Sequence, residues 1–163
     1  MILRVTSQEN LDDLMRLWND GRVMQWVGFP DGLGYDRGAV QRWFDKLQTN
    51  PQRHHFVVFT RGNRFCGEAY YKVDPDTGRA GLDIKLMPEV QMKGLGIDAL
   101  RILIRHIFQV EVSLDAVWTQ PSQLNVAAQA LYTRCGLKSK PIPADNQAGE
   151  SYWELTRAEW NRI

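Results

Sequence analysis

The sequence predicts an α+β fold: a mixed, mostly antiparallel central sheet of about six to seven strands, with helices on both faces. Three observations support this prediction. Three consecutive segments with strand character near the middle of the chain are joined by turns rich in Gly, Asn, Asp and Pro. Two strand–helix units follow them in the second half of the chain. One strand and two further helices are predicted in the first fifty residues.

The first fifty residues begin with a strand at residues 2–6. Ser7, followed three positions later by Asn, is a suitable N-cap for a helix that runs through Trp18, and Asp36 is a suitable N-cap for a second helix through about Leu47. The segment 21–35 between these helices is interrupted repeatedly by glycine and proline. We therefore predict that it is irregular, although it is rich in apolar side chains.

The remaining chain supplies the other strands and two helices. Its predicted strands are residues 54–60, 64–73, 79–87, 114–119 and 151–155. A helix rich in apolar residues at helical spacing follows the third of these strands, and residues 125–135 form another. Residues 138–150 are polar and rich in proline and alanine, which predicts a loop. The sequence contains no internal repeat or low-complexity segment, so we expect one domain over residues 1–163.

The segment Gln91-Met92-Lys93-Gly94-Leu95-Gly96-Ile97 carries the strongest functional signal. It connects a predicted strand to the start of a helix, where several backbone N–H groups have no partner within the helix and the helix dipole adds partial positive charge. Glycine allows a phosphate to approach the backbone and tolerates positive φ. This arrangement predicts an anion site for a phosphate or pyrophosphate. An ordinary turn before a helix is the alternative.

Two other phosphate-binding motifs are excluded by the same segment. It lacks the third glycine and the downstream acidic residue of a dinucleotide-binding fingerprint. It also lacks the Gly-Lys-Ser/Thr ending of a P-loop. Asp98, in the first helical turn, would repel a pyrophosphate, so we expect its side chain to point away from the anion.

A second segment, Asn125 to Leu137, completes a recognisable pattern. Asn125 is a good N-cap, and Gly136 suits the left-handed stop of a helix. Gln91, Gly94 and Gly96 match the coenzyme A signature Gln/Arg-x-x-Gly-x-Gly/Ala, while Asn125, Tyr132, Gly136 and Leu137 match the later helix of the same superfamily. The chain thus resembles the GNAT acetyltransferases, and its residues 152–160 look most like the branch that acetylates ribosomal-protein N-termini.

This resemblance implies an acyl-CoA N-acyltransferase fold and an enzyme that moves an acetyl group from acetyl-CoA to a primary amine. The amine would belong to a small molecule or to a protein N-terminus. The predicted strand at residues 79–87, just before the glycine loop, would splay from its neighbour and leave its backbone free for the pantetheine amides. The cofactor-binding residues that the resemblance implies are Leu86, Met87, Gln91, Met92, Lys93, Gly94, Leu95, Gly96, Ile97 and Asn125. Asn125 would also serve equally well as a plain helix cap.

Acetyl transfer to an amine also requires a base and an acid. Tyr132 is the candidate acid for the departing thiolate, although a tyrosine on a helix face is often only a core residue. Glu68 and Asp83, which interrupt neighbouring apolar strands, are the candidate bases. Either could instead lie on a solvated strand face. Glu154 and the pair His54–His55 are weaker candidates, and no spacing of ligands predicts a metal site.

The resemblance also implies an acceptor site framed by segments 21–35 and 138–150. Met24, Trp26, Phe29, Tyr35 and Trp153 could line it, because aromatic faces attract ammonium groups, although core positions are the more common reason for such residues. A fold that binds acyl-CoA without turnover, acting as a sensor or interaction module, is the alternative function.

Composition narrows the partners. Lys and Arg total 20 against 19 for Asp and Glu, so nothing predicts a nucleic-acid surface or a membrane-binding basic face. The N-terminus does not resemble a signal peptide, and two cysteines in a chain of 163 residues suggest free thiols in a reducing compartment. We therefore expect a cytoplasmic protein, either a monomer or a homodimer.

Overall fold

In the computed structural model, which describes residues 1–91, 93–145 and 150–162, seven strands form one sheet. Its order is β1-β2-β3-β4-β5-β7-β6. Every neighbouring pair is antiparallel except β4 and β5, which are parallel. The predicted α+β class and the mixed sheet are therefore confirmed. The strands are β1 (Ile2–Val5), β2 (Arg53–Phe59), β3 (Phe65–Asp74), β4 (Arg79–Leu86), β5 (Ala116–Thr119), β6 (Lys138–Ser139) and β7 (Trp153–Thr156).

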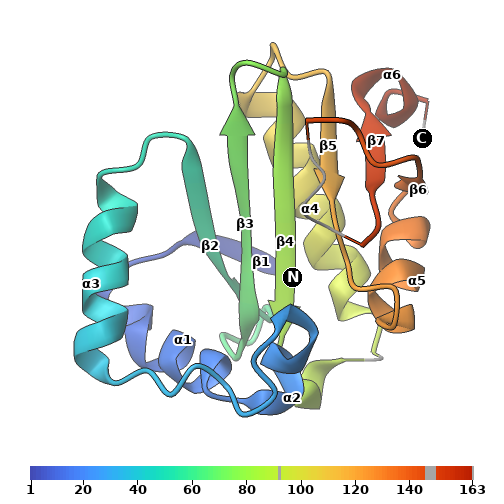
Figure 1. Ribbon diagram of the computed structural model, residues 1–163. Coiled ribbons are helices and arrows are strands. Elements are labelled where there is room, and N and C mark those ends of the chain that lie inside the picture. The colour runs from blue at the N-terminus through green and yellow to red at the C-terminus, as the bar shows by residue number, and fades with distance from the viewer. Residues whose placement is uncertain (92, 146–149, 163) are drawn as a thin grey trace.

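Helices cover both faces of this sheet (Figure 1). On one face, Trp18 of α1 and Trp43 of α3 contact His55 of β2. On the other face, His106 of α4 packs against Phe56 and Tyr71. The helices are α1 (Leu11–Trp18), α2 (Gly21–Met24), α3 (Arg37–Gln48), α4 (Leu95–Val110), α5 (Val126–Arg134) and α6 (Arg157–Trp160), with short 3₁₀ turns η1 (Gln8–Asn10), η2 (Gln25–Val27) and η3 (Pro88–Val90).

The predicted helix starts follow their capping residues. The Asp36 carboxylate accepts a hydrogen bond from the N–H of Ala39 (2.7 Å), and the Asn125 side chain accepts one from the N–H of Ala128 (3.0 Å). The segment 21–35 is less irregular than predicted. Asp20 caps the one-turn helix α2 there, and η2 follows it until Gly28, which has φ 92°. Local capping therefore outweighs the scattered glycines in this segment.

The strands β4 and β5 pair over only three positions, Arg79 to Gly81 with Ala116 to Trp118. Beyond Gly81 the two strands diverge, so the rest of β4 has an open edge on that side. The β3 side of β4 remains paired along its whole length, from Arg79 to Leu86. This is the splay expected for the predicted strand at residues 79–87. It leaves room for a ligand between β4 and β5.

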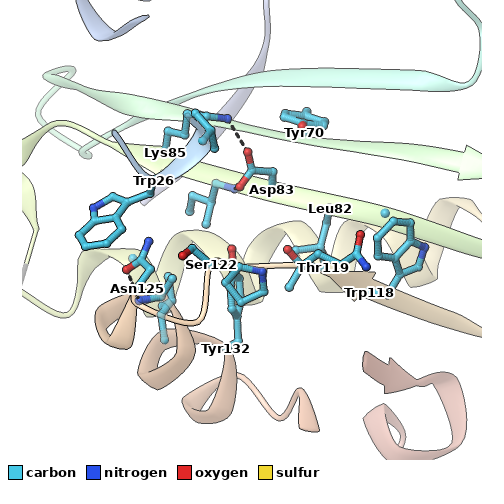
Figure 2. A pocket seen from close by; sticks show the side chains of 18 of the residues that line it. Trp26, Tyr70, Leu82, Asp83, Lys85, Trp118, Thr119, Ser122, Asn125 and Tyr132 are labelled. Carbon is cyan, nitrogen blue, oxygen red and sulfur yellow. Dashed lines mark hydrogen bonds and ion pairs between the residues drawn. The ribbon is translucent and has the colours of Figure 1, made fainter. Parts of the chain in front are cut away.

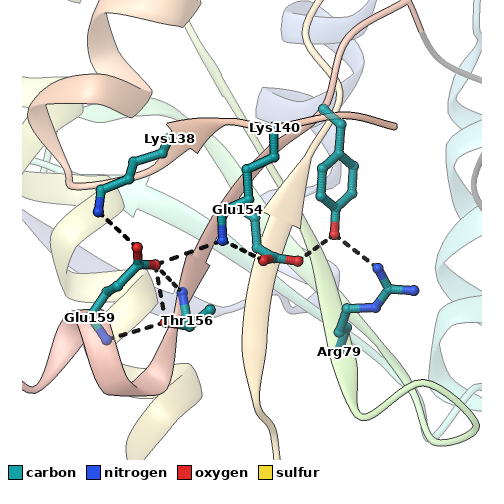
Figure 3. A network of polar contacts seen from close by, with 7 residues as sticks. Arg79, Lys138, Lys140, Glu154, Thr156 and Glu159 are labelled. Atoms are coloured by element: carbon teal, nitrogen blue, oxygen red, sulfur yellow. Dashed lines mark hydrogen bonds and ion pairs between the residues drawn. The ribbon is translucent and has the colours of Figure 1, made fainter. Parts of the chain in front are cut away.

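The C-terminal strands are held by a polar network that also includes β6, which the sequence did not predict. Glu159 accepts hydrogen bonds from the Thr156 hydroxyl (3.0 Å) and Lys138 Nζ (2.8 Å), and Glu154 pairs with Lys140 (2.7 Å), as Figure 3 shows. Glu154 therefore has a structural role and lies outside the cavity described below.

Two further expectations concern the whole chain. Cys66 and Cys135 are both buried free thiols. Within the described residues, the search for a helix long and apolar enough to cross a membrane finds none. Whether the chain is a monomer or a homodimer stays a prediction.

Candidate active site

A cavity of about 1400 Å³ lies where β4 and β5 diverge. Gly94 and Gly96, at the start of α4, lie at one end of it, and the turn between β3 and β4 lies at the other. Asp83 and Lys85 project into it from β4, while Asn125 and Tyr132 reach it from α5 (Figure 2). The cavity thus brings the predicted anion loop, a candidate base and the candidate acid to one place.

The glycine loop has the geometry of an anion site. Gly94 is the N-cap of α4 with φ 74°, and a Cβ atom added to it would meet nothing within 4 Å. Helix geometry leaves the N–H groups of Leu95 and Gly96 without partners inside the helix. The carbonyl of Gly94 accepts a hydrogen bond from the N–H of Ile97 (3.1 Å). The first turn of α4 therefore presents free N–H groups beside open space, which suits a pyrophosphate.

Gly96 has a second role that the sequence did not reveal. A Cβ atom there would lie 3.2 Å from the Leu86 side chain and 3.5 Å from that of Leu131. This glycine therefore lets α4 approach β4 and α5 closely, in addition to lining the cavity. Asp98 is exposed and does not line the cavity, in agreement with the expectation that its side chain points away.

The polar side chains of the loop are engaged with the backbone. The Gln91 side chain donates a hydrogen bond to the Leu86 carbonyl (2.8 Å), which ties the loop to the end of β4. Lys93 Nζ donates to the Glu89 carbonyl (2.7 Å). Met92, also predicted to contact the cofactor, lies outside the described residues. The Gln91 side chain therefore helps to fix the position of Leu86 at the edge of the cavity.

The end of β4 separates the two predicted pantetheine contacts. The Met87 N–H donates to the Cys66 carbonyl on β3 (2.8 Å), and Met87 does not line the cavity. Because peptide groups alternate along an antiparallel ladder, those of Leu86 and Ile84 face the open edge. We therefore retain Leu86 as a proposed contact and omit Met87.

Asp83 is the candidate base that the cavity contains. Its carboxylate accepts a hydrogen bond from the N–H of Ile84 (2.9 Å) and forms an ion pair with Lys85. Burial alone would lower the pKa of Lys85, but the adjacent Asp83 and Glu68 carboxylates outweigh burial and raise it. The Lys85 ammonium is therefore a fixed cation that orients the Asp83 carboxylate.

Tyr132 projects from α5 into the same cavity and is only 3% exposed. Burial raises the pKa of its phenol, the Asp83 carboxylate raises it further, and a hydrogen bond with the Thr119 side chain opposes the shift. Tyr132 is consequently protonated at neutral pH, which a proton donor requires. Asn125 lines the cavity too, but its side-chain oxygen is occupied by the Ala128 N–H.

Glu68, the other candidate base, lies beneath the cavity floor in a buried polar cluster. Its carboxylate accepts hydrogen bonds from the Trp18 indole N–H (2.8 Å) and from His55 Nε2 (3.0 Å), and lies 3.2 Å from Lys85 Nζ. It is 2% exposed and does not line the cavity. Burial would raise its pKa, but Lys85 and His55 outweigh burial and lower it to about 2. The buried position of Glu68 outside the cavity does not suit a base for the acceptor amine.

The Glu68 cluster predicts a pH dependence of stability. Because the folded-state pKa of about 2 lies below the ordinary value of 4.5, the contribution of Glu68 is present above pH 4.5 and is lost as the pH falls toward 2. The loss should approach about 3 kcal/mol, since one pKa unit corresponds to about 1.4 kcal/mol. Urea unfolding measured between pH 7 and pH 2.5 tests this.

The matched variants are Glu68→Gln and Glu159→Gln, because the pKa of Glu159 is also lowered to about 2, by its hydrogen bond with Lys138 above all. Glu68→Gln should flatten the pH dependence, whereas Glu159→Gln should preserve the part that comes from Glu68. Equal slopes in wild type and Glu68→Gln would contradict this account of the cluster.

Of the five residues predicted to line the acceptor site, the structure places one in the cavity. Trp26 lines the cavity, whereas Met24 is part of the core and Phe29 and Tyr35 are exposed away from it. Trp153 also lies outside the cavity. The sequence analysis missed several residues of the cavity wall, namely Arg53, Tyr70, Lys72, Lys85 and Trp118. Lys85 alternates at period two with Asp83, and Tyr70 and Lys72 alternate likewise with Glu68, which places each set on one sheet face. Arg53 and Trp118 carried no such signal.

Comparison with known proteins identifies the family to which this site belongs. The family model described as the acetyltransferase (GNAT) domain matches residues 1–138. The chain belongs to this acetyltransferase family. Membership confirms the predicted enzyme class, an acyltransferase that uses acetyl-CoA as co-substrate. Among curated proteins, none matches the sequence of this GNAT domain.

Solved structures agree with the fold of the GNAT domain. Spermidine N-acetyltransferase from Vibrio cholerae, in complex with CoA and spermine, superposes with a TM-score of 0.84 at 17% identity, covering 98% of this chain and 97% of that chain. The aminoglycoside acetyltransferase AAC(6')-Ib in complex with coenzyme A gives 0.84 at 20% identity, covering 99% and 97%. A complex of that enzyme with paromomycin and acetyl-CoA gives 0.84 at 20%, covering 99% and 96%. The ribosomal-protein branch stays a prediction.

Proposed function

We propose that this GNAT domain transfers the acetyl group of acetyl-CoA directly to the primary amine of a small molecule. The observation that carries the proposal is the single cavity that joins the glycine loop to Asp83 and Tyr132. The structural neighbours complexed with spermine and with paromomycin are consistent with a small-molecule amine. A protein N-terminus, the other acceptor considered, has no comparable support.

The first task of the chain is to hold the co-substrate. We assign the pyrophosphate to the N–H groups of Leu95 and Gly96, beside the open space at Gly94. On the open edge of β4, the Ile84 carbonyl and the Leu86 N–H would pair with the pantetheine amides, since the Ile84 N–H is engaged with Asp83 and the Leu86 carbonyl with Gln91. The thioester then lies between Asp83 on β4 and Tyr132 on α5.

The second task is proton transfer. An acceptor amine is mostly protonated at neutral pH, and the Asp83 carboxylate, directly or through one water, would accept its proton. The freed nitrogen lone pair attacks the thioester carbonyl carbon, and the carbon–sulfur bond breaks. Tyr132 donates its phenol proton to the departing sulfur. The attacking nitrogen loses its second proton as the amide forms, and this proton, directly or through water, restores the Tyr132 phenol. Lys85 and Ile84 hold the Asp83 carboxylate in position through the contacts described above.

Gly94 offers a charge-specific test of the anion site. Gly94→Asp should place a carboxylate where the pyrophosphate binds and weaken CoA binding at least about 10-fold, because a like charge at a helix N-terminus replaces an attractive site with a repulsive one. Gly94→Asn is the matched control, since asparagine has nearly the same size and also tolerates φ near 74°. Calorimetric titration of both variants with CoA gives the comparison. Equal CoA affinities in the two variants would show that the pyrophosphate does not bind at this loop.

The activity itself is tested by following free thiol release from acetyl-CoA with a panel of small-molecule amines and N-terminal peptides. We expect release that depends on a small-molecule amine. Acetyl-CoA binding without acceptor-dependent release from any member of the panel would favour the alternative, a binding module that has lost turnover.

A further inference from the structure

One face of the sheet lines the part of the cavity that lies away from the glycine loop. Strand registers place Arg53 opposite Lys72, Lys72 opposite Gly81, and Gly81 opposite Trp118, so these four residues form one row across β2, β3, β4 and β5. All four line the cavity. The adjacent row toward the glycine loop contains Asp83. The row that begins with Arg53 therefore lies beyond the candidate base as seen from the glycine loop.

Arg53 in this row has unused hydrogen-bonding capacity. Its Cζ atom lies 4.3 Å from the centre of the Tyr70 ring, and its Nε atom is buried with no hydrogen-bond partner among the residues that the structure describes. A buried donor left without a partner is unfavourable. A guanidinium that lies over an aromatic ring and lines a cavity is suited to bind a planar anion.

Lys72 adds a second cation directly across the strand pair. Like charges at opposite positions destabilise a sheet unless something compensates them. Within the described ranges, neither Arg53 nor Lys72 forms an ion pair, whereas Arg22 is paired with Asp20 and Lys85 with Glu68. Among the described cations that line the cavity, those without an ion pair are Arg53 and Lys72, side by side in this row, and Arg134 at the end of α5.

The nearby acidic residues leave this charge uncompensated. Asp74 lines the same end of the cavity, but its carboxylate accepts hydrogen bonds from the N–H groups of Asp76 and Thr77 in the β3–β4 turn. Asp76 is exposed at the cavity mouth and forms no ion pair with any described residue. Asp83, in the adjacent row, is paired with Lys85.

We propose that the acceptor is an amino acid or a similar small amino-carboxylate, whose carboxylate binds Arg53 and Lys72 while its amine lies at Asp83. This proposal rests on the proposed acetyl transfer and names its substrate class. Tyr70 connects the two binding positions, because the Arg53 guanidinium and the Lys85 ammonium lie 4.3 and 5.4 Å from the centre of its ring. An elongated polycation would instead bring a further ammonium group against Arg53 and Lys72, which like-charge repulsion opposes.

The test compares matched acceptors in the thiol-release assay: phenylalanine, its carboxamide and phenethylamine, and likewise alanine, its carboxamide and ethylamine. Wild type should have a kcat/KM about 10- to 100-fold higher for the carboxylate than for the carboxamide, the range of a hydrogen bond to a charged group. Arg53→Gln should abolish this preference and Arg53→Lys should keep part of it. Arg105→Gln, which removes an exposed arginine of α4 outside the cavity, should keep all of it.

The preference is a ratio measured within each variant, so partial unfolding of a variant does not change it. Equal rates for carboxylate and carboxamide in wild type, or a preference that survives in Arg53→Gln, would overturn the anion site while leaving acetyl transfer intact. No thiol release with any acceptor would overturn both the proposed transfer and the substrate class.

Discussion

Replacing Asp83 by asparagine should lower kcat about 10²- to 10⁴-fold, the usual contribution of a positioned general base. Asparagine keeps an oxygen for the Ile84 N–H but cannot accept the proton of the acceptor ammonium. The fold should tolerate the change, because Lys85 retains its ion pair with Glu68 (3.2 Å). The dissociation constant of acetyl-CoA should change little, since the glycine loop is untouched. Steady-state kinetics and calorimetric titration give the two quantities.

Asp76→Asn is the matched control for this variant. It removes a carboxylate from the mouth of the same cavity at an exposed position, so kcat should remain close to that of wild type. Wild-type kcat in Asp83→Asn would assign the base to another group or to water.

Replacing Tyr132 by phenylalanine should lower the single-turnover rate of acetyl transfer about 10²-fold or more. Phenylalanine keeps the buried ring and removes the proton that the departing sulfur receives. Stability should change by about 1 kcal/mol, the typical value of one hydrogen bond, here the one with Thr119. Single-turnover measurement is required because product release can otherwise mask the chemical step.

Tyr70→Phe is the comparison that makes this test specific. It removes a second phenol from the same cavity without touching α5, and the single-turnover rate should stay near that of wild type. Because the pKa of Tyr132 is raised by burial, its ionisation should cause no loss of rate below its usual pKa of about 10. If Tyr70→Phe loses the rate and Tyr132→Phe keeps it, the proton comes from Tyr70.

Local signals predicted most of the fold. Asp36 and Asn125 cap helices as expected, because an N-cap depends on only a few neighbouring residues. The hairpins of β2, β3 and β4 follow from turn composition and apolar runs. The short strand β6 was missed because two residues, Lys138 and Ser139, carry no periodic signal and depend on pairing with β7.

The site was harder to predict because side-chain partners come from distant parts of the chain. Glu68 and Asp83 both interrupt apolar strands and were equal candidates for the base. Asp83 lines the cavity, whereas Glu68 does not. The packing of Trp18, His55 and Lys85 around the Glu68 carboxylate excludes the acceptor from it. Arg53 carried no motif at all, since its significance depends on the Tyr70 ring and on the cavity.

The central claim is that one cavity holds the co-substrate with its sulfur at Tyr132 and its pyrophosphate at the start of α4. A crystal structure of the protein with acetyl-CoA tests this most directly. We predict the pyrophosphate oxygens within hydrogen-bond distance of the Leu95 and Gly96 N–H groups, pantetheine along the open edge of β4, and the sulfur within about 4 Å of the Tyr132 hydroxyl, a reach that proton donation requires. Acetyl-CoA bound outside this cavity, or bound within it with its sulfur remote from Tyr132, would contradict the account.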